Sequence, residues 1–484
     1  MDTEVRTYDC AVIGAGAAGL TAAAGAAALG AKTILIEAAR FGGDCTWNGC
    51  VPSKALLRAA AIAADARRGA RFGIDASVSV DGRGVLERVR AVRERIYAEA
   101  DAPAVLARYN VETVHAAARF VGPNTLALEG EGPATLSAQR IILATGSRPI
   151  RLDIGVPTLD SESLWDLDTL PAHMLVVGGG PVAVELSQAF ARLGVEVTMV
   201  VEGARILARD RAPAADIVAR ALREDGVDIR TECRIARAER EAGDLRVTLS
   251  DGTILTTDRI FAAVGREARI ADLDLARVGV QTCNGLIAVD AACRTNLRHI
   301  FAIGDCATDA RFTHVAERMA TVAVMNGIVG LPARFDRAAI AWTTFTDPEL
   351  AQVGSTEDEL REASRPYVVE TFPYSRLDRA IVDGVEEGFV SILTSRRGRV
   401  LGGTVVGARA GELIAEIGLA RSRRLPLRAI ANSLHVYPTY GMGVRRAADA
   451  SIIRARTPLA LSLLRRLRGL RGDAPSLDVL LPKT

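Results

Sequence analysis

The sequence lacks the features of membrane-embedded, secreted and nucleic-acid-binding proteins. Hydrophobic residues make up 49% of the chain, yet no apolar run reaches the roughly 18 residues of a membrane-spanning helix. The 60 Lys and Arg residues nearly balance the 58 Asp and Glu residues, so the charge gives no reason to expect a nucleic-acid partner. No secretory leader is visible, because residues 8–13 already have the pattern of a core strand. The sequence therefore predicts a cytoplasmic protein.

Histidine is also scarce, which bears on metal binding. Only five histidines occur in the chain, and no second cysteine pair stands at metal-ligand spacing beside Cys45 and Cys50. We therefore expect no metal site. The remaining cysteines are scattered and are interpreted as small core residues.

The most informative segment is residues 41–54, FGGDCTWNGCVPSK, which contains two cysteines five positions apart. Five residues of helix rise by about 7.5 Å, which exceeds the reach of a disulfide, so Cys45 and Cys50 must lie in a loop if they bond. A helix is expected over residues 53–68, which places Cys50 at a helix N-terminus. The positive end of that helix, together with Lys54, would lower the pKa of the Cys50 thiol.

The cysteine pair has three interpretations besides metal binding. In a cytoplasmic chain, closely spaced cysteines are more often redox-active than structural, whereas a secreted protein would use them as a structural bridge. Two buried, unreactive cysteines are the remaining alternative. Because the rest of the chain has cytoplasmic character, the pair is interpreted as a redox-active dithiol.

A nucleotide-binding pattern lies near the N-terminus. A predicted strand at residues 8–13 runs into a glycine-rich turn, an alanine-rich helix and a second strand that ends at Glu37. The turn glycines Gly14, Gly16 and Gly19 permit close approach of a pyrophosphate to a helix N-terminus, and Glu37 can accept hydrogen bonds from a ribose. The pattern predicts a bound dinucleotide.

The same pattern occurs a second time. A predicted strand at residues 174–177 leads into a turn that contains Gly178 and Gly180, and a helix and a strand at residues 195–201 follow. Two such units imply two dinucleotides. Glu202 stands just after the last strand, and an acid there favours the free 2′-hydroxyl of NADH over the 2′-phosphate of NADPH. An ordinary surface acid is the alternative interpretation of Glu202.

Together these motifs resemble those of the flavin-dependent pyridine nucleotide–disulfide oxidoreductases, the family of lipoamide dehydrogenase, glutathione reductase and mercuric reductase. The run G-G-x-C-x4-C-V-P-S-K is highly specific, and matching motifs extend from Tyr8 to about Ala450. Residues 184–194 look most like the mercuric reductase branch. The resemblance implies an α/β fold with two Rossmann-like dinucleotide-binding domains, for FAD and NAD(P), plus a C-terminal α+β dimerisation domain.

The resemblance also implies how the 484 residues divide, since one hydrophobic core cannot organise a chain of this length. The expected parts are an FAD-binding domain, an NAD(P)-binding domain, a continuation of the FAD/central domain, a dimerisation domain and a basic amphipathic tail, at residues 1–150, 151–270, 271–335, 336–457 and 458–484. The tail is expected to pack on its own protein, and contact with a membrane surface is the alternative. The implied assembly is a homodimer whose partner subunit completes the active site.

Site residues carry over from the family by position. FAD binding is implied for Gly14, Gly16, Gly19, Glu37, Gly43, Thr145, Gly146 and Asp305. Binding of the nicotinamide cofactor is implied for Gly178, Gly180, Glu185, Glu202, Gly265 and Arg266. Catalytic roles are implied for Cys50 as the thiol beside the flavin, Cys45 as the interchange thiol, Lys54 and Glu185 as an ion pair near the flavin, and Tyr437 at the base position.

The residues at the position of the catalytic base differ from those of the disulfide-reducing family members. They carry a His-Pro-Thr run followed by a glutamate, whereas the matching residues here are Tyr437-Pro438-Thr439 and Met442. A tyrosine with a pKa of about 10 is a poor base at neutral pH. The sequence therefore predicts an FAD-dependent NAD(P)H oxidoreductase that passes electrons through the Cys45–Cys50 disulfide to a metal ion, in the manner of mercuric reductase, or to a quinone or other small acceptor.

Two alternatives stay open at this point. One is a dihydrolipoamide dehydrogenase, or another disulfide reductase, in which water or His435 does the acid–base work. The other is a non-catalytic flavoprotein that senses the redox state of the cell.

Overall fold

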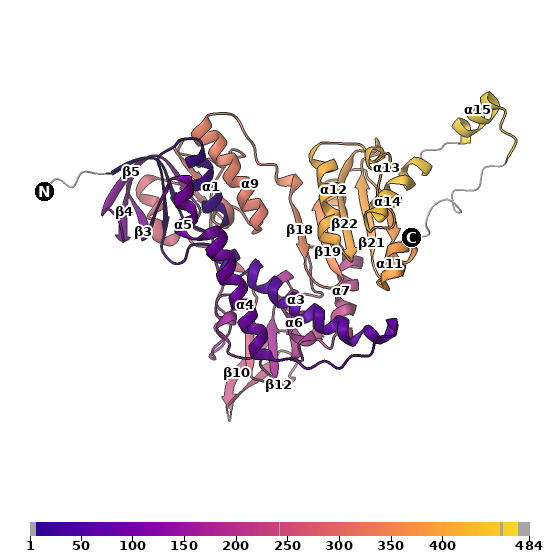
Figure 1. The fold of residues 1–484 in the computed structure, drawn as a ribbon, viewed down its shortest axis with the longest axis horizontal. Helices are drawn as coiled ribbons and strands as arrows, with labels where there is room; N and C mark the ends of the chain where they lie inside the picture. The colour runs from indigo at the N-terminus through magenta and orange to yellow at the C-terminus, as the bar shows by residue number, and fades with distance from the viewer. Residues whose placement is uncertain (1–5, 242, 455–457, 473–484) are drawn as a thin grey trace. The chain divides into compact units, whose positions relative to one another are not determined.

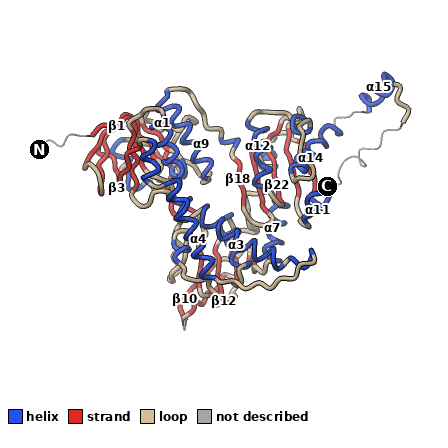
Figure 2. The backbone as a smooth tube through the Cα atoms, viewed as in Figure 1, coloured by secondary structure: helices blue, strands red, loops and turns tan. Residues whose placement is uncertain are grey.

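A computed structural model describes residues 6–241, 243–454 and 458–472. The chain divides into two compact units (Figure 1). The first contains Met1–Gly178, Arg192–Val197 and Ile235–Asp336, and the second contains Gly179–Ala191, Thr198–Arg234 and Arg337–Thr484. The division therefore passes through the second nucleotide-binding pattern. Both units mix helices and strands (Figure 2), which confirms the expected α/β class.

The first unit is built on a sheet of mostly parallel strands. β1 pairs in parallel with β2 and β5, β2 with β3, and β5 with β17, while β4 runs antiparallel between β3 and β5. The strands are β1 (Arg6–Ile13), β2 (Thr33–Glu37), β3 (Val111–Gly122), β4 (Thr125–Gly130), β5 (Thr135–Leu143) and β17 (Ile300–Ala302). The carboxyl-terminal parts of the central strands, residues 10–13 of β1 and residues 141–143 of β5, are apolar and buried because both faces of such a sheet are covered there.

Helices α1 (Ala17–Ala28) and α9 (Thr313–Val324) pack against each other beside this sheet (Figure 1). The alanines of α1 allow the close approach, and Ala22, Ala23 and Ala26 are fully buried. α1 follows β1, and α9 follows the turn after β17. Both helices therefore begin at the carboxyl ends of parallel strands, where ligands bind in open α/β sheets.

The first unit contains further helices and strands. Its remaining helices are α2 (Gly43–Trp47), α3 (Cys50–Arg67), α4 (Gly82–Ile96), α5 (Pro103–Leu106) and α8 (Leu275–Val278). Its remaining paired strands are β6 (Ser147–Pro149) with β14 (Arg266–Ala268), β7 (His173–Val177) with β13 (Arg259–Ala262), the meander β10 (Ile235–Glu241), β11 (Asp244–Leu249) and β12 (Ile254–Thr257), and β15 (Thr282–Cys283) with β16 (Leu286–Ile287).

The second unit contains a five-stranded antiparallel sheet. Its strand order is β18 (Ala341–Thr344), β19 (Glu349–Gly354), β22 (Val400–Gly407), β21 (Phe389–Thr394) and β20 (Val368–Pro373). Its main helices are α6 (Pro181–Arg192), most of which belongs to this unit, and α7 (Ala212–Glu224), α10 (Glu357–Glu362), α11 (Asp378–Asp383), α12 (Ala410–Ser422), α13 (Leu427–Ala431) and α14 (Gly441–Arg454). Strands β8 (Glu196–Val200) and β9 (Asp228–Arg230) pair in parallel, and residues 198–200 of β8 form the pairing with β9.

One hydrophobic core joins this sheet to its helices. Ile417 of α12, Val444 of α14 and Val405 of β22 are fully buried in the same cluster. The ring of Tyr374 is also fully buried there, and its hydroxyl donates to the backbone oxygen of Ala408 at 3.0 Å. The core fixes the start of α14 and the segment just before it, which contains Tyr437.

Helix α15 (Pro458–Arg468) belongs to the expected basic tail. Leu463, Leu464 and Leu467 are 59%, 48% and 74% exposed, so the expected packing of the tail on its own protein is not seen for these side chains. Residues 473–484 of the tail lie outside the described residues. Across the described part of the chain, every helix falls short of the length and apolar character needed to cross a membrane.

Candidate active site

The two redox cysteines lie at a break between two helices of the first unit. Cys45 is in the short helix α2, and Cys50 is the first residue of α3. The expected loop is therefore a helical turn followed by an interruption at Asn48 and Gly49, and α3 begins three residues earlier than residue 53. The interruption brings the two sulfurs together in a way that a continuous helix would prevent. Both cysteines are free thiols in the structure.

A threonine hydroxyl bridges the two sulfurs. Thr313 Oγ1 lies 3.4 Å from Cys50 Sγ and 3.3 Å from Cys45 Sγ. Thr313 is the first residue of α9, so the N-termini of α3 and α9 both meet the dithiol. The positive ends of the two helices favour a negative charge on sulfur.

The two thiols have opposite pKa shifts. The hydrogen bond from Cys45 lowers the pKa of Cys50 to about 6, and Thr313 and the charge of Lys54 act in the same direction while burial opposes them. The hydrogen bond to Cys50 raises the pKa of Cys45, and burial adds to the effect. Cys50 is therefore the thiolate of the pair, and Cys45 keeps its proton.

The first glycine-rich turn touches the redox segment directly. A Cβ on Gly43 would lie 2.5 Å from the Cα of Gly16, and Gly43 has a positive φ of 59°. Only glycine fits this approach. The Glu37 carboxylate holds the same turn, since Oε2 accepts from the Ala15 N–H at 2.6 Å and Oε1 accepts from the Ala39 N–H at 2.7 Å.

Several residues expected to bind FAD present groups or open space that a dinucleotide could use. Thr145 Oγ1 is buried without a hydrogen-bond partner among the described residues. No atom lies within 4 Å of a Cβ added to Gly146, so the turn is open on that side. Burial raises the pKa of the Asp305 carboxyl, and the hydrogen bond that Ser147 Oγ donates to Asp305 Oδ2 at 2.6 Å opposes this shift. An unpartnered hydroxyl, an open turn and a buried carboxylate are groups that cofactor hydroxyls and phosphates can engage.

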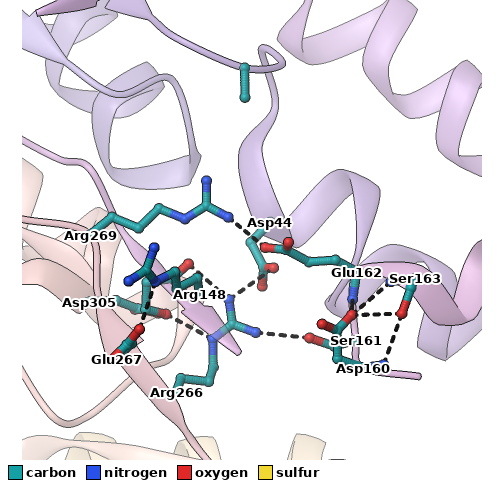
Figure 3. Close-up of polar contacts among 12 residues, drawn as sticks. Asp44, Arg148, Asp160, Ser161, Glu162, Ser163, Arg266, Glu267, Arg269 and Asp305 are labelled. Atoms are coloured by element: carbon teal, nitrogen blue, oxygen red, sulfur yellow. Dashed lines mark hydrogen bonds and ion pairs between the residues drawn. The ribbon is translucent and has the colours of Figure 1, made fainter. Parts of the chain in front are cut away.

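Arg266 lies at the centre of a polar network in this unit (Figure 3). Its Nε donates to Ser147 Oγ at 2.8 Å, its Nη2 to the Ser147 carbonyl at 3.1 Å, and its Nη1 to Ser161 Oγ at 3.1 Å. Nη2 also lies 3.0 Å from Asp44 Oδ1. The structure thus places Arg266 beside the redox segment, and its expected contact with a nicotinamide cofactor stays a prediction.

The other residues assigned to the second dinucleotide are placed as follows. Gly178 has a positive φ of 128°, and a Cβ there would lie 2.4 Å from the Ala263 carbonyl oxygen. Gly180 has open space around it, and Glu202 is exposed. Gly265 accepts a backbone hydrogen bond from Ile150 at 3.0 Å. These arrangements are compatible with a bound nucleotide, and the individual roles stay predictions.

Lys54 and Glu185 fall in different units. Glu185 is 5% exposed and accepts a hydrogen bond from the Phe345 N–H at 2.9 Å within the second unit. Lys54 is the fifth residue of α3, about one turn after Cys50, and its charge lowers the pKa of Cys50. Their expected ion pair stays a prediction.

The base position is on the surface of the second unit. Tyr437 is 65% exposed, and its hydrogen bond to Asp378 raises the pKa of the phenol. Tyr437 and Met442 line a pocket of about 290 Å³ that also contains Arg376 and Arg446. A tyrosine with a raised pKa beside a methionine cannot act as a base at neutral pH.

His435 does not replace this base. Its Nε2 lies 3.0 Å and 3.2 Å from the two carboxylate oxygens of Glu416, and its Nδ1 lies 3.1 Å from the Ser433 carbonyl oxygen. Both ring nitrogens therefore face acceptors of the protein. The arrangement ties the segment before α14 to α12 and leaves neither nitrogen directed toward a substrate.

Sequence reasoning missed several residues of the site. Thr313 and Ser147 carry no motif of their own, and their roles arise only when distant segments meet. Asp44 was inside the redox motif, and its position next to Cys45 could have marked it as a charge that acts on the dithiol.

Comparison with known proteins supports the assignment of this fold and site. The model of the pyridine nucleotide-disulphide oxidoreductase family matches residues 8–323, and the model of the dimerisation domain of that family matches residues 340–448. A dithiol beside a dinucleotide turn, followed by a dimerisation domain, defines a disulfide oxidoreductase. The chain belongs to the pyridine nucleotide-disulphide oxidoreductase family, and it is an enzyme of that class.

Comparison with individual relatives shows which members of the family the chain resembles. The chain is 36% identical over 454 residues to dihydrolipoyl dehydrogenase 2 of Haloarcula marismortui, covering 91% of this chain and 96% of the relative. It is 35% identical over 463 residues to dihydrolipoyl dehydrogenase of Thermus scotoductus, covering 92% and 98%. Among solved structures, LpdA of Mycobacterium tuberculosis aligns with a TM-score of 0.85 at 27% identity over 92% of this chain and 99% of that protein.

A further structure is similar at lower identity. A mutant of the HOCl-induced flavoprotein disulfide reductase RclA of Escherichia coli, solved as a Cu(II) complex, aligns with a TM-score of 0.82 at 25% identity, over 92% of this chain and 99% of that protein.

These findings test the expectations from sequence. The two dinucleotide-binding domains, the C-terminal dimerisation domain and the oxidoreductase class are confirmed. FAD and a pyridine nucleotide are the cofactors of this family, and the preference for NADH is consistent with the relatives. The dimerisation domain indicates a homodimer. The relatives favour the dihydrolipoamide dehydrogenase alternative over the mercuric reductase-like interpretation.

Proposed function

We propose that the chain is a dihydrolipoyl dehydrogenase that oxidises a dihydrolipoyl dithiol and reduces NAD⁺, with the reduction of lipoamide by NADH as the reverse reaction. The observation that carries the proposal is the asymmetric dithiol, in which Cys50 has a pKa of about 6 and the pKa of Cys45 is raised. Relatives named dihydrolipoyl dehydrogenase that match more than nine-tenths of the chain support the choice of substrate.

The dithiol suits this exchange. When a dihydrolipoyl group is oxidised, the lipoyl disulfide forms as the Cys45–Cys50 disulfide breaks, so that two electrons enter the protein and two substrate thiols lose their protons. Cys50 accommodates the negative sulfur because Thr313, Lys54 and the Cys45 thiol stabilise it. A substrate thiolate attacks Cys45 Sγ, which forms a mixed disulfide and releases Cys50 as the thiolate; the second substrate sulfur then closes the lipoyl disulfide and displaces Cys45, which takes up one of the two substrate protons. Bound FAD supplies the two-electron carrier between the dithiol and NAD⁺.

The protons must leave without a dedicated base. The pKa of Tyr437 is raised, Met442 carries no ionisable group, and both ring nitrogens of His435 face protein acceptors. We infer that water accepts the proton and that turnover with lipoyl substrates is slow relative to an enzyme that has a His–Glu pair.

Reduction of a metal ion or a quinone is a second candidate function, and the same residues favour it. An acceptor that takes up electrons without releasing a thiolate needs no proton donor at the position of Tyr437. The Cu(II) complex of RclA shows that a similar flavoprotein disulfide reductase holds copper. Among the described residues, no three His, Cys, Asp or Glu side chains gather to hold a metal, so a metal ion would act as substrate.

Anaerobic reduction of the purified protein tests the proposal. The flavin spectrum is recorded after NADH and then NADPH, and lipoamide, Cu(II), Hg(II) and a quinone are added in turn. We expect NADH to reduce the dithiol and lipoamide to restore the oxidised spectrum, and we expect a Cys50→Ser variant to lose the long-wavelength thiolate–flavin band. Reoxidation by Cu(II), Hg(II) or quinone but not by lipoamide would instead establish the second candidate. Reduction that stops at the flavin would exclude both.

We infer that the protein is a cytoplasmic homodimer whose partner subunit completes the site. Leu434, Val436 and Tyr437 are 98%, 75% and 65% exposed beside the base position, and burial against a second subunit would remove this apolar surface from water. The cytoplasmic placement rests on the sequence, in which the cysteines other than Cys45 and Cys50 are scattered and do not form the pattern of a secreted disulfide framework. Sedimentation of the purified chain tests the dimer, and a stable monomer at micromolar concentration would contradict it.

A further inference from the structure

The Asp44 carboxylate, next to Cys45, has an unusual environment. Its Oδ1 atom is buried and accepts no hydrogen bond from the described residues. The negative charge of the Asp44 carboxylate is balanced by an ion pair with Arg266, whose Nη2 lies 3.0 Å from Oδ1 (Figure 3). A buried carboxylate oxygen without hydrogen bond or cation is costly, so Arg266 stabilises Asp44 where it lies.

Arg266 is itself rigidly held. A guanidinium has five N–H donors, and the hydrogen bonds to Ser147 Oγ, the Ser147 carbonyl and Ser161 Oγ engage three of them, while the ion pair with Asp44 adds a further contact. Its side chain is only 20% exposed. Because the contacts to Ser147 and Ser161 fix the guanidinium, the pair with Asp44 fixes α2, and therefore Cys45, relative to β6 and β14.

The same network reaches a predicted flavin ligand. Ser147 Oγ accepts from Arg266 Nε and donates to Asp305 Oδ2 at 2.6 Å. One continuous chain of contacts thus runs from Asp44 through Arg266 and Ser147 to Asp305. Arg148 lies in the same strand pair but contacts the exposed Glu267 at 2.7 Å instead (Figure 3).

We propose that Arg266 is a positioning residue for the redox dithiol. Through its ion pair with Asp44, Arg266 holds the segment that carries Cys45 in place and offsets the negative charge of Asp44 beside the two thiols. This role replaces the nicotinamide contact that the family resemblance implies for Arg266. The proposal rests on the redox role of Cys45 and Cys50 in the proposed function but not on the identity of the electron acceptor.

The charges around the dithiol give the expected signs. The groups that act on the two thiols are Lys54, Thr313, Asp44 and the thiols themselves, and the Asp44 charge raises the pKa of both Cys45 and Cys50. Loss of Asp44 should therefore favour the Cys50 thiolate. Loss of Arg266 should expose the Asp44 charge and disfavour the thiolate.

The test is a double-substitution cycle on the reduced holoenzyme. Wild type, Asp44→Asn, Arg266→Met and the double variant are alkylated with iodoacetamide between pH 5 and 9, and mass spectrometry of the peptides separates Cys45 from Cys50. The affinity for NADH is measured on the same samples. Arg148→Met is the matched control, since it removes an arginine from the same strand pair without touching Asp44.

We expect the pH midpoint for Cys50 to fall by about half a unit in Asp44→Asn and to rise by about half a unit in Arg266→Met, which is about a threefold change in rate at fixed pH. In the Asp44→Asn background, the midpoint shift caused by Arg266→Met should be less than half of the shift that Arg266→Met causes alone. Arg148→Met should leave the midpoint of Cys50 alkylation unchanged. NADH affinity should stay within about twofold throughout.

An unchanged midpoint in Asp44→Asn, which is isosteric and spares the Arg266 contacts to Ser147, would overturn the proposal even if Arg266→Met failed to fold. Tenfold weaker NADH binding in Arg266→Met with an unchanged midpoint would return Arg266 to the nicotinamide site. Because no acceptor is used, a failure of the dihydrolipoyl assignment would leave these results unaffected.

Discussion

Replacing Thr313 with valine is expected to weaken the thiolate at Cys50. Valine has nearly the shape of threonine but no hydroxyl, so the change removes the contacts of 3.4 Å to Cys50 Sγ and 3.3 Å to Cys45 Sγ. When Cys50 is ionised, the single hydroxyl proton of Thr313 is donated to it, because the negative sulfur is the stronger acceptor. The variant should therefore have a higher Cys50 pKa.

The size of the effect follows from the geometry. A hydrogen bond to a charged group contributes about 1.5–3 kcal/mol, and one pKa unit corresponds to about 1.4 kcal/mol. Water reaches Cys50 even though its surroundings partly desolvate the thiol, and the resulting solvent screening reduces the effect to the lower end of this range. The pKa of Cys50 should rise from about 6 by about one unit. At pH 6 the thiolate fraction then falls from about one half to about one tenth.

The assay is the pH dependence of Cys50 alkylation in the reduced enzyme. We expect the rate at pH 6 to fall about fivefold in Thr313→Val, slightly offset by the greater nucleophilicity of a more basic thiolate. Thr313→Ser keeps the hydroxyl and should stay near wild type. The same midpoint in the valine variant and in wild type would show that Lys54 and the Cys45 thiol alone hold the charge, which would refute the role given to the hydroxyl.

Three further predictions concern the second unit. The double variant Tyr437→His/Met442→Glu should raise lipoamide turnover at pH 7 by at least about tenfold, because it supplies the acid–base pair; an unchanged rate would place proton transfer elsewhere. Gly407→Ala should lower the free energy of unfolding in urea by about 2 kcal/mol or more, because φ of Gly407 is 137° and the new Cβ would lie 2.4 Å from a buried tyrosine ring. A loss below about 0.5 kcal/mol, which is on the order of the measurement error, would contradict this geometry. Trp342→Phe removes the 2.7 Å hydrogen bond to Asp210, whose folded-state pKa is raised by burial. The hydrogen bond favours the charged carboxylate, so its loss should raise the folded-state pKa of Asp210 further. The loss of stability should then grow as the pH rises through the folded-state pKa of Asp210, which lies above the ordinary value of about 3.8; equal losses at pH 3.5 and pH 7 would argue against it.

The sequence predicted those turns and strands whose positions are determined by residues close to them in the chain. The turn at Gly14 and the strand that ends at Glu37 occur as expected, because hydrophobic periodicity and glycine placement determine them within a few residues. α3 begins three residues before the helix expected from residue 53, and Pro52 is its third residue. The first four N–H groups of a helix have no intrahelical partner, so proline is tolerated at the third position as well.

Contacts between distant segments were beyond local patterns. Thr313 lies 263 residues from Cys50 in the chain, and no spacing rule connects them. The ion pair between Asp44 and Arg266 likewise depends on how β6 and β14 pair. The strands β19 and β20 were also missed, although the alternating burial of β20 left a signal in its sequence.

The contact between Gly16 and Gly43 restricts how this enzyme can diversify. Gly43 has no room for a side chain, because its Cβ would lie 2.5 Å from the Cα of Gly16, so a substitution at Gly43 cannot adjust the chemistry of the dithiol. Variation must come from the opposite side, where Asp44, Thr313 and Lys54 approach the two sulfurs. Related enzymes that share the glycine contact are therefore expected to differ in dithiol reactivity mainly through the residues at these three positions, while the path of the backbone stays the same.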